Sequence, residues 1–578
     1  MSKNTTSNGE AELRAARRES RMLYWAVGIF SFFVNTLMLT GPLYMMNVYD
    51  RVLGSRSLET LIALSVLVTF LYVTMSVLDI VRGRIMGRIG ARFQARLDER
   101  VFSASIRGAS LGKAMRESQT GLRDLESVQR LITSPALMAA FDLPFSPIFF
   151  AGIFVFHAWM GYMSLASAGV LIILAIANQM LSRRPLETAN AATMQSEMTG
   201  NQIRQEAELV QALGMRHAAF TRWQFARTRS LDATIGAADV GGSFNAVIKG
   251  FRLFVQSAML GLGAYLVLEN QMSSGAMIAG SILLGRALSP IESIVGQWAL
   301  FQRAREGWTN LSVLLSEIPV EPKRMSLPVP RAQLDADQVT VIPPGEQQAA
   351  LRMISFSVGP GQACGVIGTS GAGKSTLARA LTGHWRPAGG KIRLDGAALD
   401  QYDPDVLGQH IGYLPQRVTL FDGTIKDNIA RLSATPDEAA VVRAAKRAAA
   451  HEMILKLPDG YDTRVTAAGG RLSGGQIQRI GLARAMYGDP VVLVLDEPNS
   501  NLDNDGSNAL NEAIRSMKSE GKCVLIMAHR PSAIQECDLL LMIENGMVKA
   551  FGPKEEVLRK MVANRQEITQ AVGAGGVS

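Results

Sequence analysis

Long runs of apolar residues dominate the first half of the chain and alternate with polar stretches of helical periodicity. A membrane-spanning helix needs about 20 predominantly apolar residues, because each residue rises about 1.5 Å and the hydrocarbon core is about 30 Å thick. Six runs fit this description, at about 23–46, 58–81, 142–156, 160–181, 252–268 and 274–300. The pattern predicts a helical membrane bundle with six spans.

Arginines indicate the direction of these spans. The second run is followed by Arg82, Arg84, Arg88, Arg92, Arg96 and Arg100, and the fourth by Arg183 and Arg184. Basic residues beside a span favour the cytoplasmic side, so both positions are predicted to be cytoplasmic. The connection at 269–271 lacks Lys and Arg, as expected on the opposite side. Both ends of the bundle are therefore expected in the cytoplasm.

The segment before the first run is polar and basic, with Arg14, Arg17, Arg18 and Arg21. We predict a cytoplasmic N-terminal segment over 1–22, disordered up to about residue 12. The first run resembles the apolar core of a signal peptide, but such cores span about 7–15 residues and precede a small-residue cleavage site. The run is longer and no such site follows, so a retained span is predicted.

Two ionisable residues interrupt the sixth run. Arg286 and Glu292 flank Pro290, and charged residues inside a span are candidates for a transport pathway. The alternative is a structural role, in which each charge simply pairs with a neighbouring helix.

A proline-rich stretch ends the membrane part of the chain, with Pro319, Pro322, Pro328 and Pro330. Because proline interrupts helices, this stretch predicts a linker. The predicted division is a transmembrane domain over 23–310, a linker over 311–335, a second domain over 336–565 and a flexible tail over 566–578.

Composition agrees with a membrane protein that has a cytosolic part. The 578 residues are 48% hydrophobic, and the formal net charge is +9. The arginines gather beside apolar runs, which favours membrane topology over nucleic-acid binding as the cause of the charge. The three cysteines, Cys364, Cys523 and Cys537, all lie in the second domain and lack a disulfide-framework spacing, so we expect them to be reduced.

The second domain contains a complete phosphate-binding loop of the pattern G-x-x-x-x-G-K-[ST]. Its residues are Gly368, Thr369, Ser370, Gly371, Ala372, Gly373, Lys374 and Ser375, followed by Thr376. An apolar strand precedes the loop and a helical pattern follows it. Backbone N–H groups, the helix N-terminus and Lys374 would bind the phosphates of ATP, and the Ser375 hydroxyl can ligate Mg²⁺. A glycine-rich turn that binds nothing is the weaker interpretation.

Two carboxylates follow a second buried strand. The apolar run 491–495 ends in Asp496 and Glu497, which is the Walker B pattern. Asp496 would hold Mg²⁺, and Glu497 could orient or deprotonate the water that attacks the γ-phosphate.

A further motif makes the class specific. LSGGQ lies between the phosphate loop and the Walker B strand, and it resembles the signature of ABC ATPases; its residues are Leu472, Ser473, Gly474, Gly475 and Gln476. Gln416 matches the family's Q-loop, where it would join Ser375 and Asp496 around Mg²⁺. Asp503 matches the D-loop, and His529 matches the switch histidine. Because these motifs occur together in one domain, His529 and Gln416 are expected beside Glu497 in the catalytic site.

The resemblance implies a membrane α-helical bundle of six transmembrane helices, like a type I ABC exporter, fused to an α/β P-loop ABC ATPase domain. In this family the signature of one ATPase caps the nucleotide that the other holds. A homodimer with ATP between the subunits is therefore expected.

Two departures from the family pattern stand out. Many relatives stack an aromatic residue on adenine shortly before the phosphate loop, but 339–344 contains none. Many exporters also place an acidic residue before the signature, and 466–471 has none. The sequence therefore does not predict which residue recognises the adenine base. It also does not predict which residue replaces the acidic contact between the ATPase and the membrane domain.

A finer resemblance covers nearly the whole chain. Short motifs similar to the type I secretion ATPases of the protease-exporter (PrtD-like) group lie at 50–53, 142–144, 214–215 and 343–345. The resemblance implies a bacterial inner-membrane exporter that works with a periplasmic adaptor (membrane fusion) protein and a TolC-like outer-membrane channel. Its cargo would be unfolded RTX-type proteins that carry a C-terminal signal. No peptidase-like domain is expected before the first span.

Two other functions were considered. A lipid, peptide or drug ABC exporter has the same architecture. A soluble ABC ATPase of DNA repair or translation lacks spans, so the apolar runs argue against it.

Overall fold

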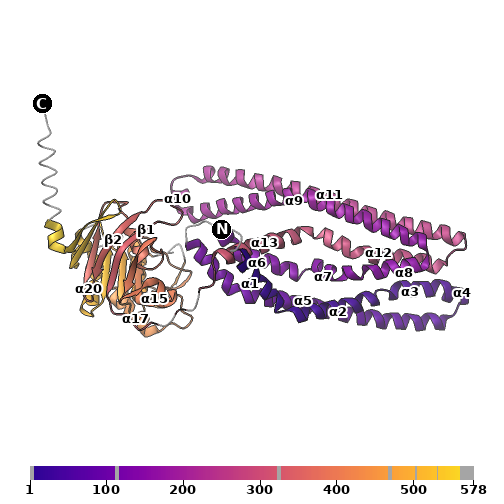
Figure 1. Ribbon diagram of the computed structural model, residues 1–578, viewed down its shortest axis with the longest axis horizontal. Coiled ribbons are helices and arrows are strands. Elements are labelled where there is room, and N and C mark those ends of the chain that lie inside the picture. The colour runs from indigo at the N-terminus through magenta and orange to yellow at the C-terminus, as the bar shows by residue number, and fades with distance from the viewer. Residues whose placement is uncertain are drawn as a thin grey trace, which may run out of the picture. The chain divides into compact units, whose positions relative to one another are not determined.

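The computed structural model describes residues 6–110, 116–321, 324, 327–466, 472–500, 504–529 and 531–559. The main division of the chain falls between Val320 and Glu321. A helical unit precedes this point and an α/β unit follows it (Figure 1).

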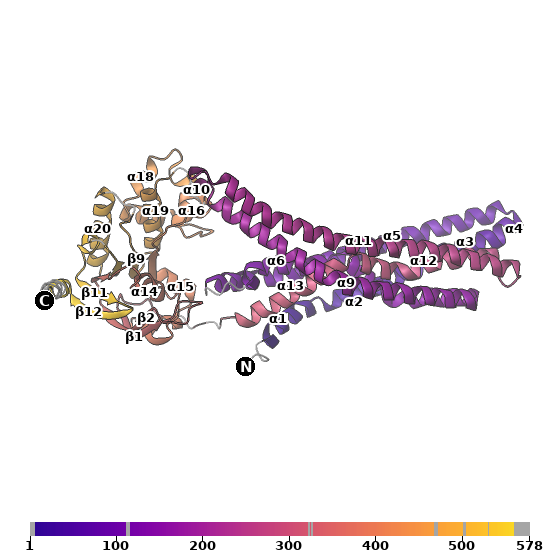
Figure 2. The same cartoon turned by 90° about the horizontal axis from the view of Figure 1, so that it is seen from above.

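The helical unit contains six candidate membrane spans by length and composition. Its helices are α1 (Thr6–Arg18), α2 (Arg21–Leu37), α3 (Thr40–Asn47), the π-helix η1 (Val48–Val52), α4 (Leu53–Ser55), α5 (Leu58–Ser110), α6 (Arg116–Ile132), α7 (Pro135–Asp142), the 3-10 helix η2 (Leu143–Phe145), α8 (Ser146–Phe156), α9 (Ala158–Gln205), α10 (Ala207–Ala212), α11 (Arg216–Leu268), α12 (Ser274–Gly296) and α13 (Trp298–Glu317). The spans lie in Arg21–Ser55, Leu58–Ser110, Pro135–Phe156, Ala158–Gln205, Arg216–Leu268 and Ser274–Gly296. Helices α9 and α11 lie side by side over much of their length (Figures 1 and 2).

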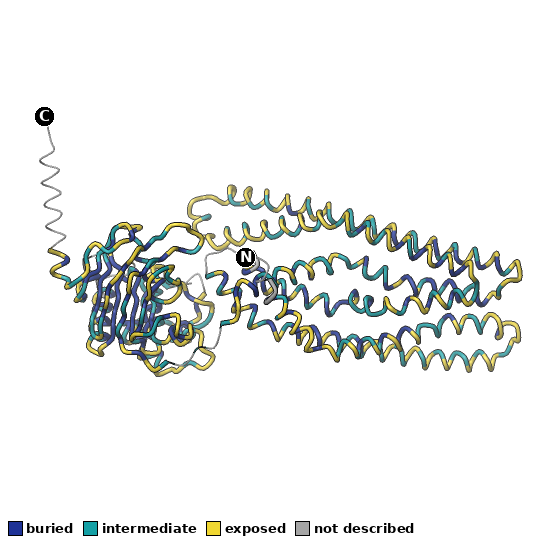
Figure 3. The backbone as a smooth tube through the Cα atoms, viewed as in Figure 1, coloured by how far each residue is buried: buried dark blue, intermediate teal, exposed yellow. Residues whose placement is uncertain are grey.

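The spans expose apolar side chains rather than burying them. Phe70 is 66% exposed, and none of the most apolar window of α5 is buried within the chain. Figure 3 shows the same contrast, with exposed outer helices and buried strands in the α/β unit. In water such a surface would be strongly unfavourable, so lipid or another copy of the chain must cover it.

The N-terminal segment corrects one prediction. Disorder up to about residue 12 is wrong, because α1 begins at Thr6 and packs against α13. Leu13 is fully buried, and the backbone N–H of Gly9 donates to Ser316 Oγ at 3.1 Å. A Cβ at Gly9 would lie 2.3 Å from the Ser312 carbonyl oxygen, so only glycine permits this close approach.

A buried polar network joins three helices of the bundle. Arg82 of α5 is 5% exposed and donates to Asp142 at the end of α7 (2.5 Å), to Ser31 of α2 (3.0 Å) and to Asp79 (2.7 Å). Asn35 also donates to Asp142, at 2.8 Å. The arginine that follows the second apolar run is therefore a buried cross-link between helices.

The α/β unit contains three sheets. The first is antiparallel, in the order β2 (Leu351–Val358), β1 (Leu334–Val341), β4 (Gly389–Leu394), β5 (Ala397–Ala398). The second has the order β12 (Met547–Pro553), β11 (Leu539–Glu544), β3 (Ala363–Ile367), β10 (Cys523–Met527), β9 (Val492–Asp496), β6 (Ile411–Leu414), and all its neighbours except β12 and β11 pair in parallel. The third pairs β7 (Gly423–Thr424) with β8 (Arg464–Val465).

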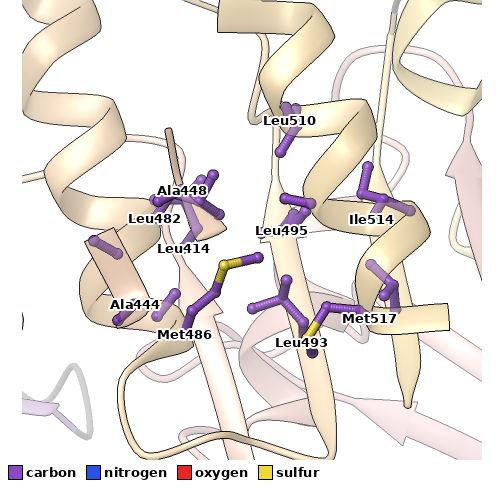
Figure 4. Packing of buried hydrophobic residues seen from close by; sticks show 14 of the residues in the cluster. Leu414, Ala444, Ala448, Leu482, Met486, Leu493, Leu495, Leu510, Ile514 and Met517 are labelled. Carbon is purple, nitrogen blue, oxygen red and sulfur yellow. The ribbon is translucent and has the colours of Figure 1, made fainter. Parts of the chain in front are cut away.

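Helices surround the sheets of the α/β unit, and several of them pack against the second sheet. They are α14 (Lys374–Leu381), η3 (Leu399–Gln401), α15 (Pro404–His410), α16 (Ile425–Ile429), α17 (Glu438–Arg447), α18 (His451–Leu455), η4 (Gly460–Asp462), α19 (Gly474–Met486), α20 (Asn504–Ser519) and η5 (Pro531–Ile534). Figure 4 shows Leu482 and Met486 of α19 and Leu510 and Ile514 of α20 packed beside Leu495 of β9. The β9 strand is fully buried, which explains its continuous apolar sequence.

The connection between the units is shorter than the predicted linker 311–335. Helix α13 continues to Glu317, where Leu311 and Leu314 are fully buried, and β1 already begins at Leu334. The second apolar run also has no separate end, because α5 continues through the arginine series to Ser110.

The Arg82 network provides a stability prediction. Asp142→Ala removes a partner of a buried guanidinium and should lower the free energy of unfolding by about 3 kcal/mol. The control is Arg14→Ala, which breaks an exposed pair with Glu10 and should cost less than about 1 kcal/mol. Denaturant titration of the detergent-solubilised chain measures both, and equal losses would contradict a structural role for the network.

Candidate nucleotide-binding site

The phosphate loop connects the buried strand β3 to helix α14. Gly371 and Gly373 adopt positive φ angles of 80° and 102°, which favour glycine. A Cβ at Gly368 would lie 2.3 Å from the Ile543 carbonyl oxygen. These three glycines allow the chain to turn tightly and direct the start of α14 toward the loop.

The side chain of Lys374 folds back across the phosphate loop. Its ammonium donates to the carbonyl oxygens of Gly368 and Thr369, at 2.9 and 3.0 Å. The side chain is buried, and this burial lowers the pKa of Lys374, although Glu497 and Asp496 oppose the shift. The loop therefore holds a buried cation where anionic phosphates would compensate its charge.

Asp496, at the end of β9, lies beside the start of α14. Its Oδ1 accepts a hydrogen bond from Ser375 Oγ at 3.2 Å. Asp496 is 3% exposed, and burial is the main cause that raises its pKa, with a smaller contribution from the charge of Glu497. The arrangement combines a carboxylate and a hydroxyl, both hard oxygen ligands, close to the loop.

Glu497 lies where three segments meet. Gln416 Nε2 donates to Glu497 Oε2 at 2.9 Å, and His529 Nε2 lies 3.0 Å from Glu497 Oε1. The backbone of Glu497 has a φ of 52°, a left-handed conformation that costs energy for a residue with a side chain, and its N–H donates to the Met527 carbonyl at 3.0 Å. The structure thus brings together Gln416, Glu497 and His529, as the motifs predicted.

The signature residues form the start of α19. Ser473 caps this helix: its side chain accepts from the Gln476 N–H at 3.3 Å, while Gln476 Oε1 accepts from the Ser473 N–H at 2.8 Å. Helix α19 packs against α16, α17 and β6, whereas α14 packs against β9, β10 and β1. Ser473 and Gly474 are exposed, so the signature presents a free helix N-terminus. The predicted D-loop residue Asp503 lies outside the described residues.

Comparison with known proteins identifies the family. The ABC transporter profile matches residues 351–500, and the ABC transporter transmembrane region matches residues 24–289. The chain is 40% identical over 575 residues to the type I secretion system ATP-binding protein PrsD of Rhizobium meliloti (strain 1021), covering 99% of both chains. The chain belongs to the type I secretion ABC transporters.

Other relatives agree with this membership. The transporter is 28% identical to the cyclolysin secretion/processing ATP-binding protein CyaB of Bordetella pertussis, over 93% of this chain and 76% of that protein. It is 29% identical to the leukotoxin translocation ATP-binding protein LktB of Mannheimia haemolytica, over 93% and 77%. The structure of a bacterial Atm1-family ABC exporter with ATP bound has a TM-score of 0.78 and 21% identity, covering 94% and 96%, which supports the fold. The transporter is an ATPase coupled to membrane transport.

The two charged residues of the sixth span are not paired with each other. Glu292 Oε2 lies 3.0 Å from Nη1 of Arg252 on α11, 40 residues away in sequence. Arg286 is exposed on α12. In the sequence Arg252 marks only the predicted start of the fifth span, and its pairing with Glu292 was not predicted.

Base selectivity should be modest in this transporter. Ile342 and Pro343, which follow β1, offer no aromatic face for adenine, so phosphate contacts should supply most of the affinity. GTP should compete with ATP. Titration with both nucleotides should give dissociation constants within about a hundredfold of each other, or roughly 2.7 kcal/mol, and a larger ratio would reveal a base contact elsewhere.

Proposed function

We propose that this transporter exports unfolded proteins across the bacterial inner membrane as the ATP-driven component of a type I secretion system. The observation that carries the proposal is the 40% identity to PrsD over the whole chain, together with the nucleotide motifs. Lipid, peptide or drug export is the alternative. It would gain support if small amphiphiles, but not a C-terminal cargo peptide, raised the ATPase rate.

In the proposed ATP site, Lys374 and the loop N–H groups bind the β- and γ-phosphates. The residues also fit Mg²⁺, because two oxygens bound at about 2.1 Å in octahedral geometry lie about 3 Å apart, and Ser375 Oγ and Asp496 Oδ1 are 3.2 Å apart. Gln416 would add its amide oxygen. When bound, Mg²⁺ would neutralise charge on the phosphate oxygens.

Glu497 is the proposed general base. It would accept a proton from the attacking water as the water oxygen bonds to the γ-phosphorus and the bond to the ADP oxygen breaks. The hydrogen bond from Gln416 and the close contact with His529 would hold the carboxylate in one orientation. His529 and Gln416 are therefore assigned to positioning Glu497 and the γ-phosphate.

Two copies are needed for a complete site in this proposal. The signature N-terminus, from Leu472 to Gln476, would cap the γ-phosphate bound by the other copy. Asp503 would contribute to the same interface. ATP binding then favours the closed pair, and hydrolysis releases it, which shifts the spans between two conformations.

Topology and partners complete the proposal. The arginines that follow the second and fourth spans support cytoplasmic termini and a cytoplasmic ATPase unit. A periplasmic adaptor and a TolC-like outer-membrane channel would continue the path. Arg286, and Glu292 with its partner Arg252, are the candidates for groups along the transport pathway.

The catalytic assignment predicts different defects for two variants. Glu497→Gln keeps the shape of the side chain but removes the base, so ATP should still bind while hydrolysis falls by about 10²-fold or more. Lys374→Ala should lose ATP binding itself. Binding of a fluorescent ATP analogue and phosphate release measure the two steps, and near-normal turnover by Glu497→Gln would remove Glu497 from this role.

The cargo assignment predicts the position of the export signal. An RTX-type cargo should leave the cell unfolded and fold outside, where Ca²⁺ orders its acidic glycine-rich repeats. Deleting the cargo's C-terminal segment should retain it in the cytoplasm, whereas deleting its N-terminal segment should not. Immunoblots of culture medium measure both, and secretion that survives the C-terminal deletion would contradict the assignment.

A further inference from the structure

A cavity of about 1050 Å³ lies within the helical unit and has no part in the nucleotide site. Its walls include Tyr24 near the start of α2, Arg183 near the end of the apolar part of α9, and Trp298 directly after α12. All three mark the same end of their spans. The cavity therefore lies at one membrane surface, the one proposed to be cytoplasmic.

The lining of this cavity is aromatic and basic. Among the described residues, four arginines and two glutamates line it. Glu187 pairs with Arg183 at 2.9 Å, while the Arg17 guanidinium lies 5.9 Å from the centre of the Trp308 ring, which stacks on Phe93. Arg303 and Arg305 are exposed and form no ion pair within the described part of the chain. The cavity thus presents excess positive charge beside flat apolar rings.

Trp298 supplies a hydrogen-bond donor that has no acceptor. Its indole Nε1 is buried and without a hydrogen-bond partner among the described residues. An indole N–H can only donate, and buried donors in folded proteins are almost always paired. This N–H is closed off from the cavity space, so Trp298 lines the cavity with the rest of its ring.

A second cavity of about 200 Å³ extends from the same place and is almost wholly apolar. It lies between Ile172 and Ile176 of α9 and Ile291 and Ile294 of α12. Gln179 and Trp298 line both cavities, so the two spaces adjoin. A polar space at the membrane surface therefore continues into an apolar slot between two spans.

We propose that these two cavities bind one anionic phospholipid, with its phosphate at the arginines and an acyl chain in the apolar slot. The positive lining complements the phosphate, and basic pockets between spans on the cytoplasmic side bind such headgroups. Aromatic side chains suit this depth because one end is apolar and the other is polar. The lipid is a resident ligand rather than cargo, and the inference does not rest on the cargo assignment.

Lipid retention by the purified full-length transporter tests this site. After delipidation in detergent and incubation with phosphatidylglycerol, native mass spectrometry should find one tightly held phospholipid per chain. Arg303→Gln and Arg305→Gln each remove one positive charge from the lining. Each should reduce retention about tenfold or more, since a hydrogen bond to a charged group is lost.

The matched control is Arg184→Gln, which removes an exposed arginine beside Arg183 that does not line the cavity. Retention by this variant should equal that of the unaltered chain. Equal retention by all variants would mean that only general surface lipid was measured and would overturn the site.

The apolar slot is tested independently by Ala175→Phe, which fills space in the slot and changes no charge. This variant should also release the lipid, whereas glycerol 3-phosphate, a headgroup without acyl chains, should not displace it. Displacement by glycerol 3-phosphate, or unchanged retention in Ala175→Phe, would overturn the assignment to a lipid. Displacement by a C-terminal cargo peptide would likewise overturn it and indicate a peptide site.

Discussion

The parallel pairing of five strands is the constraint on which the ATPase site depends. Because β6, β9, β10, β3 and β11 run in one direction, their carboxyl ends lie at one edge of the sheet. Gln416 follows β6, Glu497 follows β9 and His529 follows β10, so residues distant in sequence meet at one carboxylate. The phosphate loop follows β3 at the same edge, which places the buried Lys374 beside Asp496.

The two units expose different kinds of surface. In the α/β unit the central strands β3, β10 and β9 are buried, and the N-terminus of α19, capped by Ser473, is exposed. In the helical unit the spans expose many apolar side chains, and two of the arginines form ion pairs between helices, Arg82 with Asp142 and Arg252 with Glu292. In the proposed dimer, lipid and the second copy of the chain would cover these surfaces.

Most of the features that could be predicted from the sequence are encoded by short local motifs. Apolar runs located all six candidate spans, and short motifs predicted a candidate nucleotide site in which Gln416, Glu497 and His529 lie together, because those features follow from a few consecutive residues. Features that depend on distant partners were missed. The order of α1 depends on burial of Leu13 and on Ser316 in α13, and the partner of Glu292 is 40 residues away. The predicted linker 311–335 begins too early, because α13 continues to Glu317. Leu311 and Leu314 of this helix are buried by tertiary packing, which the prolines that follow do not indicate.

The central claim is that each ATP site combines the phosphate loop of one copy with the signature of the other. Heterodimers isolated with two affinity tags test it directly when every chain carries Glu497→Gln, so that ATP is trapped. With Lys374→Ala in one copy and Ser473→Arg in the other, both defects fall on one composite site, and the other site should trap one ATP per dimer. With both substitutions in the same copy, each site has one defect, and no ATP should be trapped. The opposite pattern would contradict the shared site and show that each chain completes its own.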